Sequence, residues 1–82
     1  MITAGQIRAA RALLRWPAKR LAESSGVSVP TIQRMESAEG VPGGLSRNLD
    51  AIQTALEEAG IQFIDDNGGG PGVRLRRPTA AS

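Results

Sequence analysis

The chain lacks the side chains on which many enzymes and metalloproteins depend. It contains no cysteine, no histidine and no tyrosine among its 82 residues. Disulfide bonds, thiol chemistry and the usual zinc sites are therefore excluded, and the commonest general base is missing. We expect a protein that is not an enzyme and that needs neither a metal nor a cofactor.

Aromatic residues and long apolar runs are scarce as well. The chain has one tryptophan and one phenylalanine, and no apolar stretch approaches the length of a membrane span. Its first residues do not show the basic and then apolar pattern of a secretory signal. We therefore expect a soluble, cytoplasmic protein with no membrane partner, and one small domain for which association of two copies is a natural supplement to a small core.

The clustered carboxylates offer little for catalysis. Glu57 and Glu58 are neighbours in a predicted helix, and Asp65 and Asp66 are neighbours in a predicted turn. The turn faintly resembles a calcium loop, but most of the oxygen ligands of such a loop are absent. A turn explains these residues better than an active site does.

Charge is distributed unevenly along the chain, although the net charge is only +2. Residues 1–47 carry seven basic and three acidic side chains, whereas residues 48–66 carry five acidic side chains and no basic one. Three arginines, Arg74, Arg76 and Arg77, follow near the C-terminus. A surface that faces phosphates would have such a basic side, but so would a solvated charge pattern, and charge alone does not decide between them.

The N-terminal segment predicts a well-capped helix. Thr3 and Gln6 have the spacing of a capping box, and Ile2 and Ile7 occupy the positions of a hydrophobic staple. Trp16-Pro17 should end the helix, because the residue before a proline is pushed out of the α region. The apolar residues between these points keep a helical period; they are Ile7, Ala10, Leu13 and Leu14.

The next segment predicts two short helices that cross at a tight turn. Ala22 is the small residue that a close crossing needs, and Gly26 stands where a chain often takes a positive φ after a helix. Ser28 is a good N-cap for a second helix over residues 28–37, in which Ile32 faces the core. This is the spacing of a helix-turn-helix, whose second helix enters the major groove of DNA in DNA-binding proteins.

These residues resemble the phage repressor-like helix-turn-helix regulators, of the Cro and cI type and also called the XRE family. The resemblance covers roughly residues 3–60 and implies a DNA-binding domain of helices with double-stranded DNA as the partner. The residues that carry it are Leu21, Ala22, Gly26, Val27, Ser28, Thr31, Ile32, Met35 and Glu36. The chain departs from the family at Pro17 and Ala18, where many members have a polar cap and a glutamine that reaches phosphate.

A fourth helix and then two strands are predicted after a glycine-rich joint. Ser46 is expected as the N-cap of this helix and Gly60 as its C-terminal stop. Beyond Gly60 the period of the apolar residues changes from helical to alternating, over residues 61–64 and 72–76, with a turn-forming run between them. The two alternating segments predict a β-hairpin.

The hairpin is expected to serve in dimerisation, because two strands alone are barely stable in water and an edge strand offers a pairing surface. The expected interface residues are Ile61, Phe63, Val73 and Leu75. Two alternatives remain open: the hairpin packs within one chain, or residues 68–82 form a flexible basic tail. Many family members end in a fifth helix instead, so their dimer geometry does not carry over to this chain.

The predicted organisation is therefore a mainly α fold. A four-helix repressor-like helix-turn-helix domain spans residues 1–60, a β-hairpin for dimerisation spans residues 61–78, and a disordered tail spans residues 79–82.

The resemblance also implies which residues meet DNA. Arg34 is the main candidate for reading bases, because arginine can donate two hydrogen bonds to guanine O6 and N7. The full base-facing set is Val29, Pro30, Thr31, Gln33 and Arg34. Contacts to phosphate, which set the register without reading sequence, are expected from Lys19, Arg20, Ser28 and Arg47. Glu36 is expected to form a structural ion pair with Arg11 rather than to approach DNA.

The sequence thus predicts a sequence-specific DNA-binding regulator of transcription that acts as a homodimer, with the helix over residues 28–37 in the major groove. Repression and activation are not distinguished, because that outcome depends on where the bound site lies relative to a promoter. The alternative is a protein-binding module, antitoxin-like or an anti-activator, that retains the fold. Uncharged and basic side chains around Arg34 favour DNA as the partner.

Overall fold

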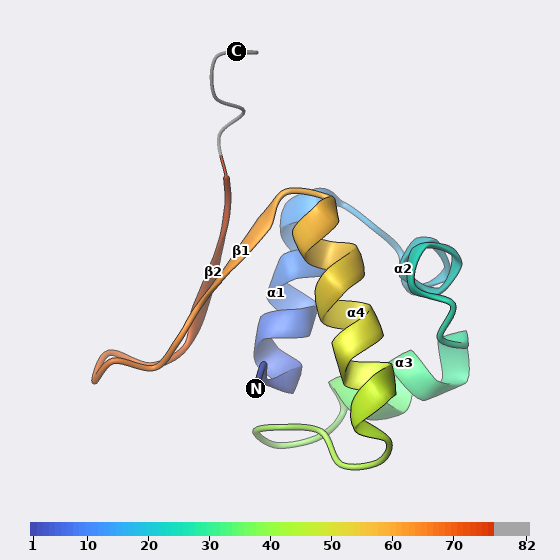
Figure 1. Ribbon diagram of the computed structural model, residues 1–82, viewed down its shortest axis with the longest axis horizontal. Helices are drawn as coiled ribbons and strands as arrows, with labels where there is room; N and C mark the ends of the chain where they lie inside the picture. Colours follow the sequence, from blue (N-terminus) through green and yellow to red (C-terminus); the bar gives the residue numbers. More distant parts are fainter. Residues whose placement is uncertain (77–82) are drawn as a thin grey trace.

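The computed structural model describes residues 1–76, and it contains four helices followed by two strands (Figure 1). The helices are α1 (Ala4–Leu14), α2 (Ala18–Ser25), α3 (Val29–Glu36) and α4 (Ser46–Glu58), and the strands are β1 (Ile61–Ile64) and β2 (Gly72–Leu75). The predicted fold class, mainly α with a C-terminal hairpin, is confirmed. Within residues 1–76, no helix is long and apolar enough to cross a membrane.

Helix α1 begins with the predicted capping box. Thr3 Oγ1 accepts a hydrogen bond from the Gln6 N–H at 3.1 Å, and Gln6 Oε1 accepts one from the Thr3 N–H at 2.8 Å. The helix ends slightly before the predicted Trp16-Pro17 boundary. Its last residue is Leu14, and Arg15 then takes the left-handed conformation with φ 56°.

Gln6 also ties the hairpin to α1. Its side chain is buried, and its Nε2 donates to the carbonyl oxygens of Ile64 at 3.2 Å and Gly72 at 2.9 Å. Ile64 and Gly72 are paired across the hairpin, at the end next to its turn. Both polar atoms of the Gln6 side chain therefore have partners, as a buried amide requires.

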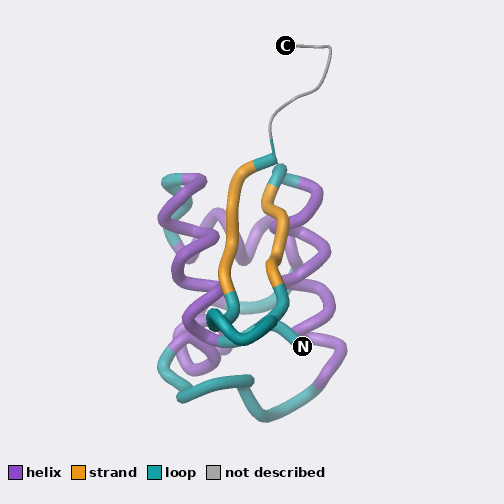
Figure 2. The backbone as a smooth tube through the Cα atoms, turned by 90° about the vertical axis from the view of Figure 1, so that its left-hand side faces the viewer, coloured by secondary structure: helices purple, strands orange, loops and turns teal. Residues whose placement is uncertain are grey.

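The hairpin pairs within one chain and packs on the helices. Strand β1 is antiparallel to β2, and β2 contacts α1 while β1 contacts α4. Figure 2 shows the two strands side by side in front of the helices, and Figure 1 places them on the side of the molecule opposite α2 and α3. Residues 68–76 are thus part of the fold rather than a free tail. The predictions made for Arg77 and residues 77–82 lie outside the described residues.

One residue assigned to the dimer interface belongs to the core instead. Ile61 is 1% exposed in the single chain, so it cannot meet a partner, and that part of the prediction is wrong. Phe63 and Val73 are partly buried against the core, whereas Leu75 is 46% exposed. The alternating pattern identified the residues that share a face, but the helices of the same chain cover most of that face.

The core draws on every helix and on the first strand. The largest fully buried side chains are Ile7, Leu21, Ile32, Ile52, Leu56 and Ile61. Helix α4 contacts α1, α2 and β1, and Gly60, with φ 111°, turns the chain from α4 into β1. Ser46 is the first residue of α4 rather than its N-cap; Leu45 occupies the cap position and makes no side-chain cap bond.

Candidate nucleic-acid interface

Helices α2 and α3 are joined by the three residues Gly26, Val27 and Ser28. Gly26 has φ 78°, a left-handed backbone conformation that residues other than glycine rarely adopt. Its N–H donates to the Ala22 carbonyl oxygen at 2.9 Å. Val27 is buried and fastens the turn to the core. The predicted helix-turn-helix geometry is thereby built from local features of the chain.

The first turn of α3 is held by hydrogen bonds among its own side chains. Ser28 Oγ accepts from the Thr31 N–H at 3.4 Å and donates to Thr31 Oγ1 at 2.9 Å. Pro30 lies in the same turn, where its missing N–H leaves no hydrogen bond unmade. The start of α3 is therefore both well defined and at the surface.

Helix α3 has a buried face and an exposed face. Ile32, Met35 and Glu36 are buried. The base-facing candidates on the other side are exposed at Pro30, Gln33 and Arg34, and half-buried at Val29 and Thr31. The structure therefore brings all five candidates together on one short helix, with three of them open to solvent.

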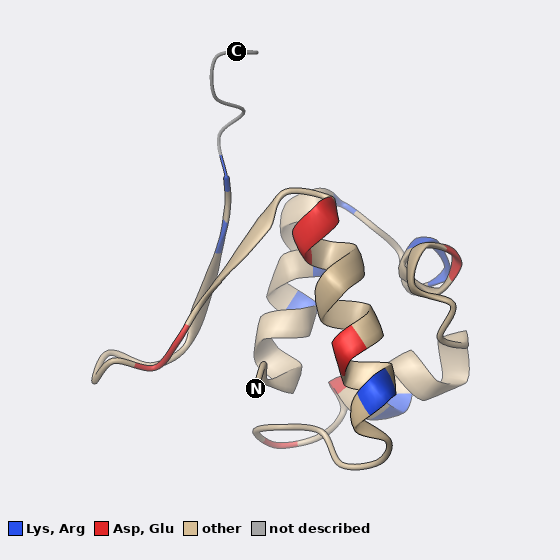
Figure 3. Cartoon of the chain, in the orientation of Figure 1, with Lys and Arg blue, Asp and Glu red and all other residues tan. Residues whose placement is uncertain are grey.

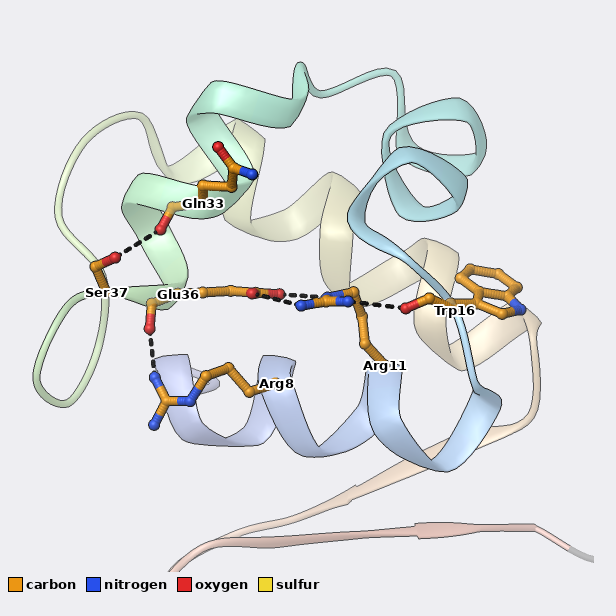
Figure 4. A network of polar contacts seen from close by, with 6 residues as sticks. All are labelled: Arg8, Arg11, Trp16, Gln33, Glu36 and Ser37. Atoms are coloured by element: carbon orange, nitrogen blue, oxygen red, sulfur yellow. Dashed lines mark hydrogen bonds and ion pairs between the residues drawn. The ribbon is translucent and has the colours of Figure 1, made fainter.

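Glu36 is bound by Arg11 across the space between α3 and α1 (Figure 4). Arg11 Nε donates to Glu36 Oε2 at 2.6 Å and Arg11 Nη2 donates to Oε1 at 2.8 Å, while Nη1 donates to the Trp16 carbonyl oxygen at 2.8 Å. The side chain of Arg11 is 24% exposed and that of Glu36 is 10% exposed. The ion pair implied by the resemblance is present, and it keeps the Glu36 carboxylate away from the outer surface.

This pair also fixes the charge of Arg11. Its hydrogen bonds to Glu36 raise the pKa of the guanidinium above its usual range, against the opposing effect of burial. A raised pKa in the folded state stabilises the protein below the ordinary pKa of arginine, and the gain is lost only as pH rises through that strongly alkaline range. Arg11 therefore stays protonated near neutral pH.

Arg8 provides a second link that the sequence did not predict. Its Nη1 donates to the Glu36 carbonyl oxygen, and Arg8 stands three residues before Arg11 on α1. That spacing puts both arginines on one side of the helix, and it is the feature of the sequence from which the bond of Arg8 to α3 could have been predicted. In Figure 4 the Gln33 side chain points away from this network, while its carbonyl oxygen accepts from Ser37 Oγ at 2.9 Å.

The residues expected to bind phosphate lie in α2, at the N-cap of α3 and in α4. Lys19 in the first turn of α2 and Arg47 in the first turn of α4 are exposed. Figure 3 shows basic positions in blue on α2 and on α4. Arg20 is exposed too, but its guanidinium carbon lies 5.2 Å from the centroid of the Trp16 ring, a cation–π contact. Ser28 is exposed with its hydroxyl already bonded to Thr31. Of the four residues, Arg20 and Ser28 have these contacts within the chain, so Lys19 and Arg47 are the better candidates for binding phosphate.

Arg34 lies at the end of α3, beside the loop that leads to α4. It lines a surface depression together with Met35, Ala38, Pro42, Gly43 and Gly44. Among residues 1–76, the ion pair present joins Arg11 to Glu36, and Arg34 has no such partner. Its guanidinium is therefore available to an external acceptor.

No protein-family model matches the chain, and no curated protein matches its sequence. In the part of the chain that the structure describes, no group of three acidic side chains is placed to hold a metal ion. The function must be inferred from the geometry of α3 and its surroundings.

Proposed function

We propose that the protein is a cytoplasmic, sequence-specific DNA-binding regulator of transcription that acts as a homodimer and inserts α3 into the major groove. The observation that carries this proposal is the exposed face of α3, where Arg34 has no ion-pair partner among the described residues 1–76 while the Glu36 carboxylate on the same helix is bound by Arg11. The proposal agrees with the resemblance of residues 3–60 to phage repressor-like regulators.

The electrostatics of α3 support an anionic partner. Glu36 is the one acidic residue of the helix, and it is buried against Arg11, so the outer face presents Arg34 without a competing negative charge. Lys19 and Arg47 at the starts of α2 and α4 add positive charge at two helix N-termini. Helix N-termini with basic side chains are favourable positions for phosphate.

The rigidity of α3 supports base reading rather than loose contact. The helix is capped by Ser28, buried through Ile32 and Met35, and fastened to α1 by two arginines. A reading helix held in this way approaches the bases with little loss of conformational entropy on binding.

The hairpin supports association of two copies. The Arg76 N–H donates to the Gly60 carbonyl oxygen at 2.7 Å, and the antiparallel alternation from this pair leaves the backbone groups of Val73 and Leu75 facing the free edge of β2. The side chain of Leu75 is 46% exposed, and Leu13 on the neighbouring helix α1 is 42% exposed. Within residues 1–76 this edge of β2 is unpaired, and together with exposed leucines on β2 and α1 it suits pairing with a second β2.

The test of DNA binding begins with selection of sequences from a randomised duplex pool by the native protein. We expect one enriched sequence pattern, with an affinity that falls steeply between about 50 and 200 mM salt. Arg34→Ala should weaken binding to the selected duplex about 10- to 100-fold, the loss of one bidentate contact to guanine. Arg74→Ala, at an exposed arginine on the hairpin, serves as the charge-matched control and should retain the preference.

Two results would count against this assignment. An unchanged affinity of Arg34→Ala for the selected duplex would exclude Arg34 as the reading residue. A pool that shows no enriched sequence would overturn DNA recognition and favour the protein-binding module.

The dimer is tested by the mass in solution. Sedimentation should give twice the 8.6 kDa of one chain. Leu75→Glu should give monomers, because it places a charge at the apolar edge, whereas Leu45→Glu, at a 57% exposed leucine in the loop before α4, should not. A native protein that stays monomeric both free and on DNA refutes the hairpin dimer.

A further inference from the structure

The exposed part of the first turn of α3 is unusually poor in hydrogen-bonding groups for a surface that would face bases. Val29 and Pro30 have no polar side-chain atom, and the hydroxyl of Thr31 is bonded to Ser28. Pro30 is the exposed one of the two apolar residues, and it also lacks a backbone N–H. At this position α3 offers a flat apolar ring and nothing polar.

From this surface we infer that each half-site contains a thymine whose 5-methyl group packs against Pro30, next to a guanine that Arg34 reads. The inference rests on the proposed function. The thymine methyl is the apolar group that a base pair presents in the major groove, whereas the other groups there are hydrogen-bond donors and acceptors. A proline ring pressed against such a donor or acceptor would leave it desolvated and unpaired, which is costly.

The spacing of the two residues limits how far apart their bases lie. Pro30 and Arg34 are four residues apart, so they lie on one side of α3 and are separated by roughly 6 Å along its axis. Successive base pairs are about 3.4 Å apart. The thymine and the guanine should therefore fall within about two base pairs of each other.

A competing explanation assigns Pro30 to structure alone, because proline is favoured in the first turn of any helix. The two explanations differ in one respect. A structural proline has no preference among bases, whereas a methyl-contacting proline distinguishes thymine from uracil, which differs only by the 5-methyl group.

The experiment uses the duplex selected by the native protein, prepared with deoxyuridine in place of each thymine in turn. At one thymine per half-site, within about two base pairs of the guanine, we expect binding about fourfold weaker, the equivalent of one methyl group left unburied. Pro30→Ala should bind the thymine and uracil duplexes within about twofold of each other. Ser24→Ala, a change at an exposed side chain of α2 outside the proposed DNA contacts, should keep the fourfold preference.

The outcomes separate this inference from the function on which it rests. If the native protein binds every uracil duplex as tightly as the thymine duplex, the methyl contact is overturned while DNA recognition stands. If the preference for thymine survives in Pro30→Ala, Pro30 is not the residue that makes the contact. If no sequence is selected from the pool, the proposed function itself has failed.

Discussion

The two faces of α3 are built in opposite ways. On the inner face, Ile32 and Met35 lie in the core and Glu36 receives hydrogen bonds from two arginines of α1. On the outer face, Pro30 and Arg34 are exposed, and Arg34 has no ion-pair partner within residues 1–76. One helix of eight residues thus combines an inner face whose charged group is paired with an outer face whose charged group has no ion-pair partner within residues 1–76.

This difference teaches where to look for function in a small domain. A polar group that is buried and fully bonded contributes to the folded state, whereas one held at a rigid surface without a partner is free to bind something else. Substitutions on the inner face should therefore change the free energy of unfolding, and substitutions on the outer face should change binding. The following predictions test that separation.

The largest effect is expected for Glu36→Ala. This variant leaves the Arg11 guanidinium, 24% exposed, without its carboxylate, and breaking a buried pair from one side costs about 3–5 kcal/mol. Urea unfolding followed by the fluorescence of Trp16, the one tryptophan of the chain, measures the loss.

The control replaces both partners at once. Arg11→Met with Glu36→Leu substitutes an apolar contact for the pair, and such replacements are often close to neutral in stability. The double variant should therefore be much more stable than Glu36→Ala. A cost of less than about 1 kcal/mol for Glu36→Ala would contradict the view that the pair fastens α3 to α1.

The features of the fold that could be predicted from the sequence are those set by short spacings along the chain. The capping box of Thr3 and Gln6 follows from a separation of three residues, and the turn at Gly26 follows from its place after a helix. The partner of Glu36 came from the family resemblance. Ion pairs between residues that are 25 positions apart leave no periodic signal in a single sequence.

Contacts between distant segments were the ones missed. The hydrogen bonds from Gln6 to Ile64 and Gly72 span 58 and 66 positions. Nothing in the sequence around these residues indicates that they are bonded. Ile61 was assigned to a dimer because alternation shows which side chains share a face of a strand but not which element covers that face. Serine is a residue type that suits an N-cap, but Ser46 is already the first residue of α4, and Leu45 occupies the N-cap position.

An intermediate effect is expected at the N-terminus of α3. Ser28→Ala removes the N-cap of α3 and should lower the free energy of unfolding by about 1 kcal/mol. Ser24→Ala, at an exposed serine within α2, is the matched control and should be neutral or slightly stabilising, since alanine is the better helix former. Thermal unfolding monitored by circular dichroism compares the two, and equal midpoints would show that the cap contributes nothing.

The smallest effect on stability is expected for Arg34→Ala, the variant with a large expected effect on DNA binding. Removal of an exposed side chain that has no ion-pair partner in the described part of the chain should change the free energy of unfolding by no more than about 0.5 kcal/mol. The same urea titration measures it. A loss above about 1 kcal/mol would mean that Arg34 stabilises the loop at Pro42, Gly43 and Gly44, with which it lines a depression. The outer face would then be partly structural, and weaker DNA binding by the variant would no longer identify a base-reading residue.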